Sequence, residues 1–240
     1  MFPGGSWLSN GEAYDSDLTR LVFEILQVLA EKKDRSVNLL DVGASTGSFS
    51  LLPIFDKRIN VFAFEPNSRA FELLENNIRM NSITENCTLF NYALSDKEGE
   101  MQLLIPKQSG LATLSDQPVR FRKNKVKHIQ TVKVFTLDKI WKDNKDTIDF
   151  IKIDAEGWDY FVLKGGQKAL EKYSPLLLME FDEENIRQCN LTQEVIISFL
   201  KKLNYQVYKI GNDVFCVPKP VDIEVYMTFK LFYKSYVQLL

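Results

Sequence analysis

The sequence predicts an α/β fold built on an open, mostly parallel sheet, and three observations support it. Short apolar runs that end in acidic residues or glycine alternate with longer runs whose apolar residues recur at helical spacing. This rhythm is interrupted between residues 98 and 137, where two strand-like runs suggest a hairpin, and it then resumes. Two further strand-like runs around Gly211-Asn212-Asp213 indicate a closing hairpin.

The first half of the sheet is expected within residues 15–95. An amphipathic helix is predicted over residues 15–33, because its start is acidic and its end carries lysines. Buried parallel strands are expected at three short apolar runs, residues 37–43, 59–66 and 87–95. Helices are expected between these strands, at residues 48–56 with a bend near Pro53, and at residues 68–81. Such strand–helix–strand repeats form right-handed parallel sheets.

The excursion that follows is expected to stand above the sheet as a hairpin. Its strands are predicted at residues 99–106 and 129–137, separated by a polar, basic loop over residues 107–128. The alternation then continues with strands at residues 148–157 and 174–182, helices at residues 158–173 and 192–204, and the closing hairpin of residues 205–211 and 213–218.

Composition narrows the class of protein. The 240 residues suit one domain, and 30 basic against 32 acidic residues give a net charge of −2, which favours neither nucleic acid nor an anionic membrane. The three cysteines are scattered without metal-site spacing, as expected of buried thiols in a reducing compartment. No signal-peptide pattern and no long apolar run are present. We therefore expect a cytoplasmic protein without a transmembrane segment.

Three segments are predicted along the chain: an N-terminal arm and helix over residues 1–35, the main domain over residues 36–218, and an apolar tail over residues 219–240. The tail is rich in Tyr, Phe and Leu but lacks the polybasic face of a peripheral membrane anchor. It is therefore expected to dock on the domain or to form a homodimer contact.

The turn after the first strand is the first candidate binding element. Gly43 and Gly47 flank Ala44, Ser45 and Thr46, at the sheet edge where ligands of open parallel sheets bind. A dinucleotide site would need a glycine where Ser45 stands, because the pyrophosphate presses on the backbone there. S-adenosylmethionine has no phosphate, so the spacing favours a methyl donor.

Acidic residues flank this turn on both sides. Asp41 precedes it and is expected to face the cationic end of the cofactor. Glu65, followed by Pro66, ends the second strand, where an acid accepts hydrogen bonds from both ribose hydroxyls. At the end of the third strand, Ala93 and Ser95 offer an apolar wall and a backbone group for adenine, whereas Asp96 suits either the adenine site or a plain turn.

The fourth strand carries charges that a buried strand normally avoids. Lys152 and Asp154 alternate on it and should share a face, which indicates a paired cluster or a functional site. Glu156 follows at the start of a helix, where it could be only a cap.

Five segments in this order resemble the FkbM family of S-adenosylmethionine-dependent methyltransferases: "LLDVGASTGSFS", "FAFEP", "NYALSDKEGE", "VKVFTLDKIW" and "IDFIKIDAEGWDYFVLKGG". The resemblance covers roughly residues 36–217. It implies a class I methyltransferase (Rossmann-like) fold, with seven strands of which the last is antiparallel. It also implies O-methylation of a hydroxyl, commonly on a sugar or polyketide-like acceptor. Ser45 stands where family members often carry Asn, a departure that leaves both glycines of the turn intact.

By the same resemblance, Gly43 and its neighbours hold the methionine part of the cofactor and Glu65 holds the ribose. Ser95 and Asp96 lie near adenine, and Asp154 lies beside the transferred methyl group. An alcohol acceptor must also lose its proton, and the candidates for accepting it are Asp154, Glu156, Lys152 and Glu180.

Two versions of the acceptor site remain open. Asp154, Glu180 and Asp182 lie at neighbouring strand ends and could bind Mg²⁺. We favour the version without a metal, in which these acids bind acceptor hydroxyls, because no single segment has ligand spacing. His128, the only histidine, is more typical of a surface loop than of a base.

Other functions are consistent with parts of the sequence. A protein that binds S-adenosylmethionine without turnover is the main alternative, since no single residue stands out as the base. An NAD-dependent oxidoreductase is disfavoured by Ser45. The basic residues 120–128 contain one aromatic side chain, so a solvated loop or an attraction for an anionic sugar fits them better than nucleic acid. The expected partner is a small-molecule or glycan substrate.

Overall fold

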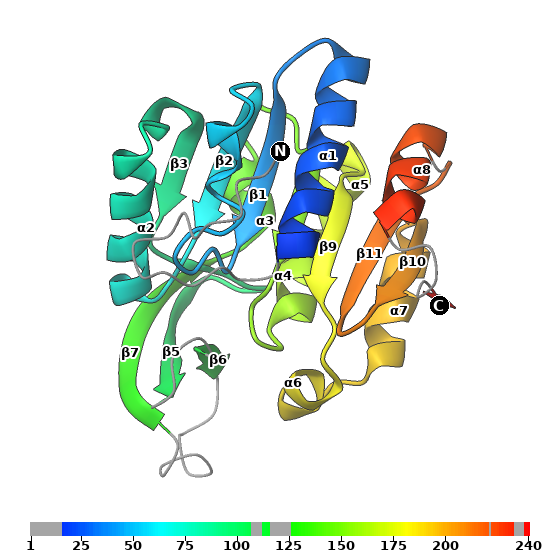
Figure 1. Ribbon diagram of the computed structural model, residues 1–240. Coiled ribbons are helices and arrows are strands. Elements are labelled where there is room, and N and C mark those ends of the chain that lie inside the picture. The colour runs from blue at the N-terminus through cyan, green and yellow to red at the C-terminus, as the bar shows by residue number, and fades with distance from the viewer. Residues whose placement is uncertain (1–15, 107–111, 116–125, 221, 233–237) are drawn as a thin grey trace.

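The computed structural model (Figure 1) describes residues 16–106, 112–115, 126–220, 222–232 and 238–240. A large sheet runs through the middle of the molecule with helices on both faces, and a smaller sheet extends from one end of it. The N-terminal arm and most of the basic loop of residues 107–128 lie outside the described residues.

The large sheet has the predicted mostly parallel arrangement. Its strands follow the order β12-β10-β11-β9-β8-β1-β2-β3. Their bounds are β1 Val37–Val42, β2 Ile59–Phe64, β3 Cys87–Phe90, β8 Phe150–Ile153, β9 Leu176–Glu180, β10 Tyr205–Ile210, β11 Asp213–Pro218 and β12 Gln238–Leu239. β11 is antiparallel to both β9 and β10, as expected for the last strand of a seven-stranded class I sheet. The short β12 adds an eighth strand at the edge.

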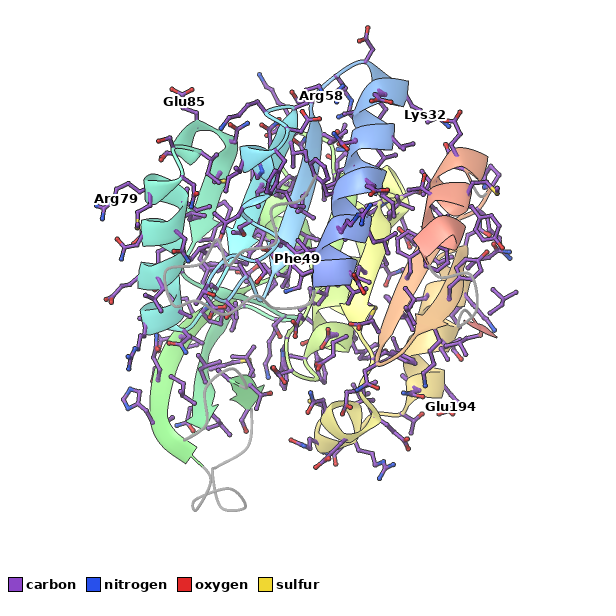
Figure 2. The ribbon with its side chains drawn as sticks, viewed as in Figure 1. Lys32, Phe49, Arg58, Arg79, Glu85 and Glu194 are labelled. Atoms are coloured by element: carbon purple, nitrogen blue, oxygen red, sulfur yellow. The ribbon has the colours of Figure 1, made fainter. Side chains whose placement is uncertain are left out.

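Helices cover the two faces unequally. α1 Ser16–Lys33, α2 Ser68–Met80 and α8 Ile223–Phe232 pack on one face, and α3 Leu137–Trp141, α4 Asp159–Gly165, α5 Gln167–Tyr173, α6 Glu183–Gln188 and α7 Gln193–Lys202 belong to the other side. Alternate residues of β1 enter the two cores, because a strand sends successive side chains to opposite faces. In Figure 2, Phe49 lies inside between helices and sheet, whereas Arg79, Glu85 and Glu194 point outward.

The predicted excursion forms a second sheet of order β4-β7-β5-β6. Its strands are β4 Ala93–Leu94, β5 Gly99–Pro106, β6 Thr113–Ser115 and β7 Val126–Phe135. β5 and β7 form a long antiparallel pair, as the hairpin prediction requires. The sheet projects beyond the carboxyl ends of the parallel strands, beside the edge where ligands bind in such folds (Figure 1).

Three local predictions were wrong. Residues 48–56 form turns and a single 3₁₀ helix, Leu52–Ile54, instead of a helix, because Pro53 removes a backbone donor. The run 87–95 splits into β3 of the large sheet and β4 of the small one. The helix predicted over residues 158–173 breaks at Gly166, where a Cβ would approach the Leu137 side chain within 2.9 Å.

The tail docks on the domain through α8. Phe229 is fully buried and stacks on Phe215 of β11 with ring centroids 4.6 Å apart. Lys32, near the end of α1, forms ion pairs with Asp222 at 2.6 Å and Glu224 at 3.1 Å. The homodimer alternative stays a prediction, as does the functional separation of the three segments. No helix of the described residues is long and apolar enough to cross a membrane.

Candidate functional site

The glycine turn after β1 is pressed against the neighbouring strand end. Gly43 has a φ of +74°, and a Cβ there would lie 1.9 Å from the backbone oxygen of Asp154. Gly47 has a φ of +107°, and its Cβ would meet Leu74 at 2.8 Å. Both positions therefore need glycine for conformation and for space. The N–H groups of Gly43 and Ala44 donate to the Phe64 carbonyl, which fixes the turn over the end of β2.

Glu65 lies under this turn with its carboxylate held by backbone groups. One oxygen accepts a hydrogen bond from the Ser45 N–H at 2.8 Å, and the other accepts one from the Asn67 N–H at 2.7 Å. Burial raises the pKa of Glu65 to about 7, against the two hydrogen bonds, which lower it. The two N–H donors orient both oxygens, so the geometry suits the ribose role that the resemblance implies. Pro66 follows, and its carbonyl accepts from the Gln130 side chain of β7 at 3.2 Å.

Asp41 differs from its expected role. Its side chain has no exposed surface, and its carboxylate accepts a hydrogen bond from Ser50 at 2.6 Å and lies 3.5 Å from the Lys152 ammonium. A carboxylate enclosed in this way supports the turn from behind and offers no exposed face to a ligand. The cause is the 48–51 segment, which folds back over β1 as turns and brings Ser50 onto the carboxylate.

Lys152 joins the turn to the acidic side of the site. Its ammonium donates to the Gly43 carbonyl at 2.9 Å, lies 3.5 Å from the Asp154 carboxylate, and stands 5.2 Å from the centre of the Phe49 ring. Burial alone would lower the pKa of Lys152, but the carboxylates of Asp154 and Asp41 raise it above its ordinary value. A raised pKa favours the charged ammonium, which has no lone pair to accept a proton, and this disfavours the base role considered for Lys152 from the sequence.

The three residues predicted for the adenine wall make contacts within the protein. Ser95 has no exposed surface, and its hydroxyl accepts a hydrogen bond from the Trp158 indole at 3.0 Å. Asp96 forms an ion pair with Lys164 at 3.0 Å. Ala93 is buried in the core of the small sheet. These contacts are structural, and an adenine role for the three residues stays a prediction.

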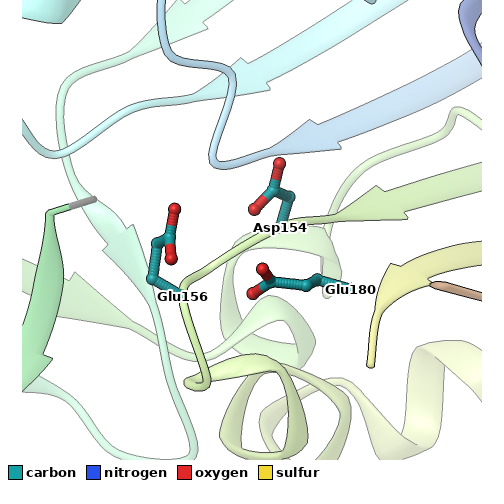
Figure 3. A group of neighbouring side chains, drawn as sticks. All are labelled: Asp154, Glu156 and Glu180. Atoms are coloured by element: carbon teal, nitrogen blue, oxygen red, sulfur yellow. The ribbon is translucent and has the colours of Figure 1, made fainter. Parts of the chain in front are cut away.

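Three carboxylates converge at the ends of β8 and β9. An oxygen from each of Asp154, Glu156 and Glu180 lies within 4.8 Å of the other two, and Figure 3 shows the side chains pointing into a common space. We call these residues the acid group. Their spacing would suit a cation, but such groups also occur without one. Asp182, the third expected ligand, instead caps α6, accepting from the Glu184 and Asn185 N–H groups at 2.9 and 3.0 Å.

The carboxylates of the acid group repel one another, and their pKa values are raised. Burial, followed by the charges of Glu180 and Asp154, raises the pKa of Glu156 to about 8. Burial and the charge of Asp154 raise the pKa of Glu180 to about 7. Glu156 has a left-handed φ of +52°, an unusual backbone for a side chain of this size. Perturbed carboxyl groups of this kind are typical of functional sites.

Two residues of this region escaped the sequence reasoning. Asn185 of α6 donates to Glu156 at 3.0 Å and to both oxygens of Glu180 at 3.2 Å. Asp159 is buried, and burial together with Glu180 and Asp154 raises its pKa well above the ordinary value. The Asp and Glu residues around α6 were a visible signal of a capped helix, but six residues without apolar periodicity gave no helix prediction. His128 is exposed on β7 and is not part of the acid group.

Comparison with known proteins decides the family. The family model described as "Methyltransferase FkbM domain" matches residues 41–207. This chain belongs to the FkbM methyltransferase family. The family resemblance and the class I fold predicted from the sequence are both confirmed, and the FkbM family is a family of S-adenosylmethionine-dependent methyltransferases.

Two proteins similar to this chain carry the name methyltransferase. The hexuronic acid methyltransferase AglP of Haloferax volcanii is 27% identical over 150 residues, which span 62% of this chain and 57% of AglP. The structure of methyltransferase FkbM from Methylobacillus flagellatus KT has a TM-score of 0.52 at 18% identity, covering 76% of this chain and 43% of that protein. This chain thus spans little more than half the length of the relative it matches in sequence, and the structural likeness shows the fold alone.

Proposed function

We propose that this FkbM protein is an O-methyltransferase that moves the methyl group of S-adenosylmethionine to a hydroxyl of a sugar or related small molecule. The observation that carries the proposal is the contact between Gly43 and Asp154. It sets the cofactor turn, with Glu65 beneath it, directly against the acid group. A methyl donor and a proton acceptor are thereby neighbours at one edge of the sheet.

On the cofactor side, each residue has a separate task. The backbone of residues 43–47 holds the methionine part, and the Glu65 carboxylate binds the ribose hydroxyls. Lys152 fixes the turn by its bond to the Gly43 carbonyl. Because S-adenosylmethionine brings an activated sulfonium, the protein mainly has to align an oxygen in line with the methyl carbon.

On the acceptor side, the acid group removes one proton. As the hydroxyl oxygen bonds to the methyl carbon, the carbon–sulfur bond breaks, S-adenosylhomocysteine leaves, and a carboxylate of Glu156 or Glu180 takes the hydroxyl proton. The raised pKa values of both groups, about 8 and about 7, match this task near neutral pH. Asp154, at the end of β8, is best placed to orient the acceptor beside the methyl group.

A hydroxyl is a better acceptor here than a carboxylate. Three converging carboxylates repel an anionic oxygen, and a carboxylate acceptor needs no base. The name of AglP, a hexuronic acid methyltransferase, suggests a sugar acid as the first acceptor class to try, with transfer to one of its hydroxyls. We propose the reaction without a metal, with the acid group acting directly.

Calorimetric titration with S-adenosylhomocysteine and with NAD tests the cofactor. Binding of the first and no heat from the second are expected, and the absence of heat from S-adenosylhomocysteine would refute the proposal. Methyl transfer to glucose, glucuronic acid and glycolipids, with and without EDTA, then tests the reaction. Product that survives mild alkali is an ether, as expected, whereas an alkali-labile ester would show that a carboxylate is the acceptor. Loss of activity in EDTA would show that a metal is needed, and cofactor binding without transfer to any acceptor would favour the binding-protein alternative.

A further inference from the structure

Asn185 occupies the position between the two half-buried glutamates of the acid group. It comes from α6, 29 residues after Glu156 and 5 residues after Glu180, and its side-chain nitrogen lies 3.0 Å from a Glu156 oxygen and 3.2 Å from each Glu180 oxygen. The nitrogen, and not the oxygen, of this amide must face the carboxylates, because an amide oxygen in its place would meet three acceptors. The amide is therefore a donor shared by two acids.

The backbone of Asn185 is held by contacts of its own. The Asn185 N–H donates to the capping carboxylate of Asp182 at 3.0 Å. The Asn185 carbonyl lies so close to Gly157 that a Cβ there would come within 2.4 Å of it. Gly157, with a φ of +90°, follows Glu156 directly, so α6 and the loop that carries Glu156 are locked together.

We propose, on the basis of the function proposed above, that Asn185 is a positioning residue: it holds the Glu156 and Glu180 carboxyl groups together so that the pair shares one proton and presents one ionised carboxylate to the acceptor. Two like charges within 4.8 Å are costly, and protonation of one of the two glutamates removes the repulsion between them. The Asn185 amide then stabilises the remaining negative charge.

The charges around Glu156 and Glu180 are consistent with one proton being bound by the pair. Asp154 of β8 adds a negative charge that raises the pKa of both glutamates, and Asp182 does so for Glu180. Asp159 of α4, buried beside them, has its own pKa well raised by burial and by Glu180 and Asp154. Lys152 opposes these groups and lowers the pKa of both glutamates, as Asn185 does. Lys152, however, is also bonded to Gly43, whereas the side-chain bonds that the structure describes for Asn185 all go to the pair.

A carboxyl titration tests the proposal without a known acceptor. Glutamate labelled with ¹³C at the carboxyl carbon is followed by NMR from pH 5 to 9, with the signals assigned by E156Q and E180Q. In the unaltered protein the two groups should titrate as a coupled pair. Asn185→Leu should raise both midpoints by about one unit, because a donor to the charged form is lost. Gln188→Leu, which removes an exposed amide from the same helix, should change neither midpoint.

Three further measurements separate the possible failures. The affinity for S-adenosylhomocysteine should remain within about threefold of the original in Asn185→Leu, and its absence in the unaltered protein would instead refute the proposed function. If Asn185→Leu does not fold, the isosteric Asn185→Asp is used, and it should move the midpoints in the same direction. With an active acceptor, the pH profile of methyl transfer should move upward with the midpoints. Unchanged midpoints, or independent titration of the two groups, would overturn the role of Asn185.

Discussion

The two halves of the site satisfy their carboxylates in opposite ways. Beneath the cofactor turn, Glu65 stands alone and each of its oxygens accepts a backbone N–H. Across Gly43, the acid group crowds three carboxylates together, with Lys152 and the Asn185 amide as the donors that the structure describes near them. The first arrangement orients a single carboxylate with two backbone N–H groups. In the second arrangement the carboxylates repel one another, and binding a proton or a substrate hydroxyl reduces this repulsion. Such an arrangement suits a site whose charge changes during the reaction.

Replacing the glycine between the halves should have the largest effect. In Gly43→Ala the new Cβ would overlap the Asp154 carbonyl, and the left-handed backbone adds strain. We expect the free energy of unfolding to fall by roughly 3–4 kcal/mol and binding of S-adenosylhomocysteine to be lost. Gly211→Ala is the matched control, since its φ is +58° and a Cβ would find nothing within 4 Å. It should cost only about 1 kcal/mol and leave binding intact. Equal losses in chemical denaturation would show that strain, and not the contact, matters.

Removing the single carboxylate of the cofactor half should affect that half alone. Glu65→Ala leaves the Ser45 and Asn67 N–H groups without their acceptor and removes the proposed ribose contact. The affinity for S-adenosylhomocysteine should fall about 100-fold, the effect of two lost hydrogen bonds. Glu75→Ala, on the surface of α2, should leave the affinity measured by calorimetry unchanged. A loss below threefold in Glu65→Ala would place the ribose elsewhere.

The repulsion among the carboxylates of the acid group predicts a smaller effect, a dependence of stability on pH. Glu65, Glu156 and Glu180 have folded pKa values raised to about 7, about 8 and about 7 from 4.5. Between the unfolded pKa of 4.5 and these raised values, the folded state binds more protons than the unfolded state. The free energy of unfolding therefore falls as pH rises from about 5 to about 8. The acids with lowered pKa, such as Asp149, act below this window.

Melting temperatures measured from pH 5 to 8 check this sign. The double variant E156Q/E180Q should flatten the decline, because it removes the two titrating groups of the acceptor half while Glu65 remains. A melting temperature that rises toward pH 8, or an equally steep decline in the double variant, would contradict the claim that Glu156 and Glu180 cause the loss of stability.

The same contrast explains what the sequence could predict. The turn with Gly43 and the acid Glu65 are close in sequence, so strand rhythm and spacing located them. Asp154, Glu180 and Asp182 were expected near one another because parallel strands end at one edge, but Glu156 takes the place of Asp182 in the acid group. The contacts that hold these residues in place could not be predicted from the sequence. Asp41 was expected to face the cofactor and Lys152 was a candidate base, but turns fold over Asp41 and the Gly43 carbonyl accepts a hydrogen bond from Lys152. Asn185 lies on a helix too short for a periodic signal, and its role depends on the tertiary approach of α6 to Gly157.

The packing of α8 against α1 has a consequence for the order of synthesis. Lys32 and Asp222 are paired although 190 residues separate them, and Phe229 completes the same core that α1 begins. Chains emerge from the ribosome from the N-terminus. The contact of α1 with α8 therefore forms only after nearly the whole domain has been synthesised. The face of β10 and β11 that Phe229 covers therefore stays bare until residues 222–229 have been made. Chains halted before that point would expose an aromatic surface that chaperones recognise.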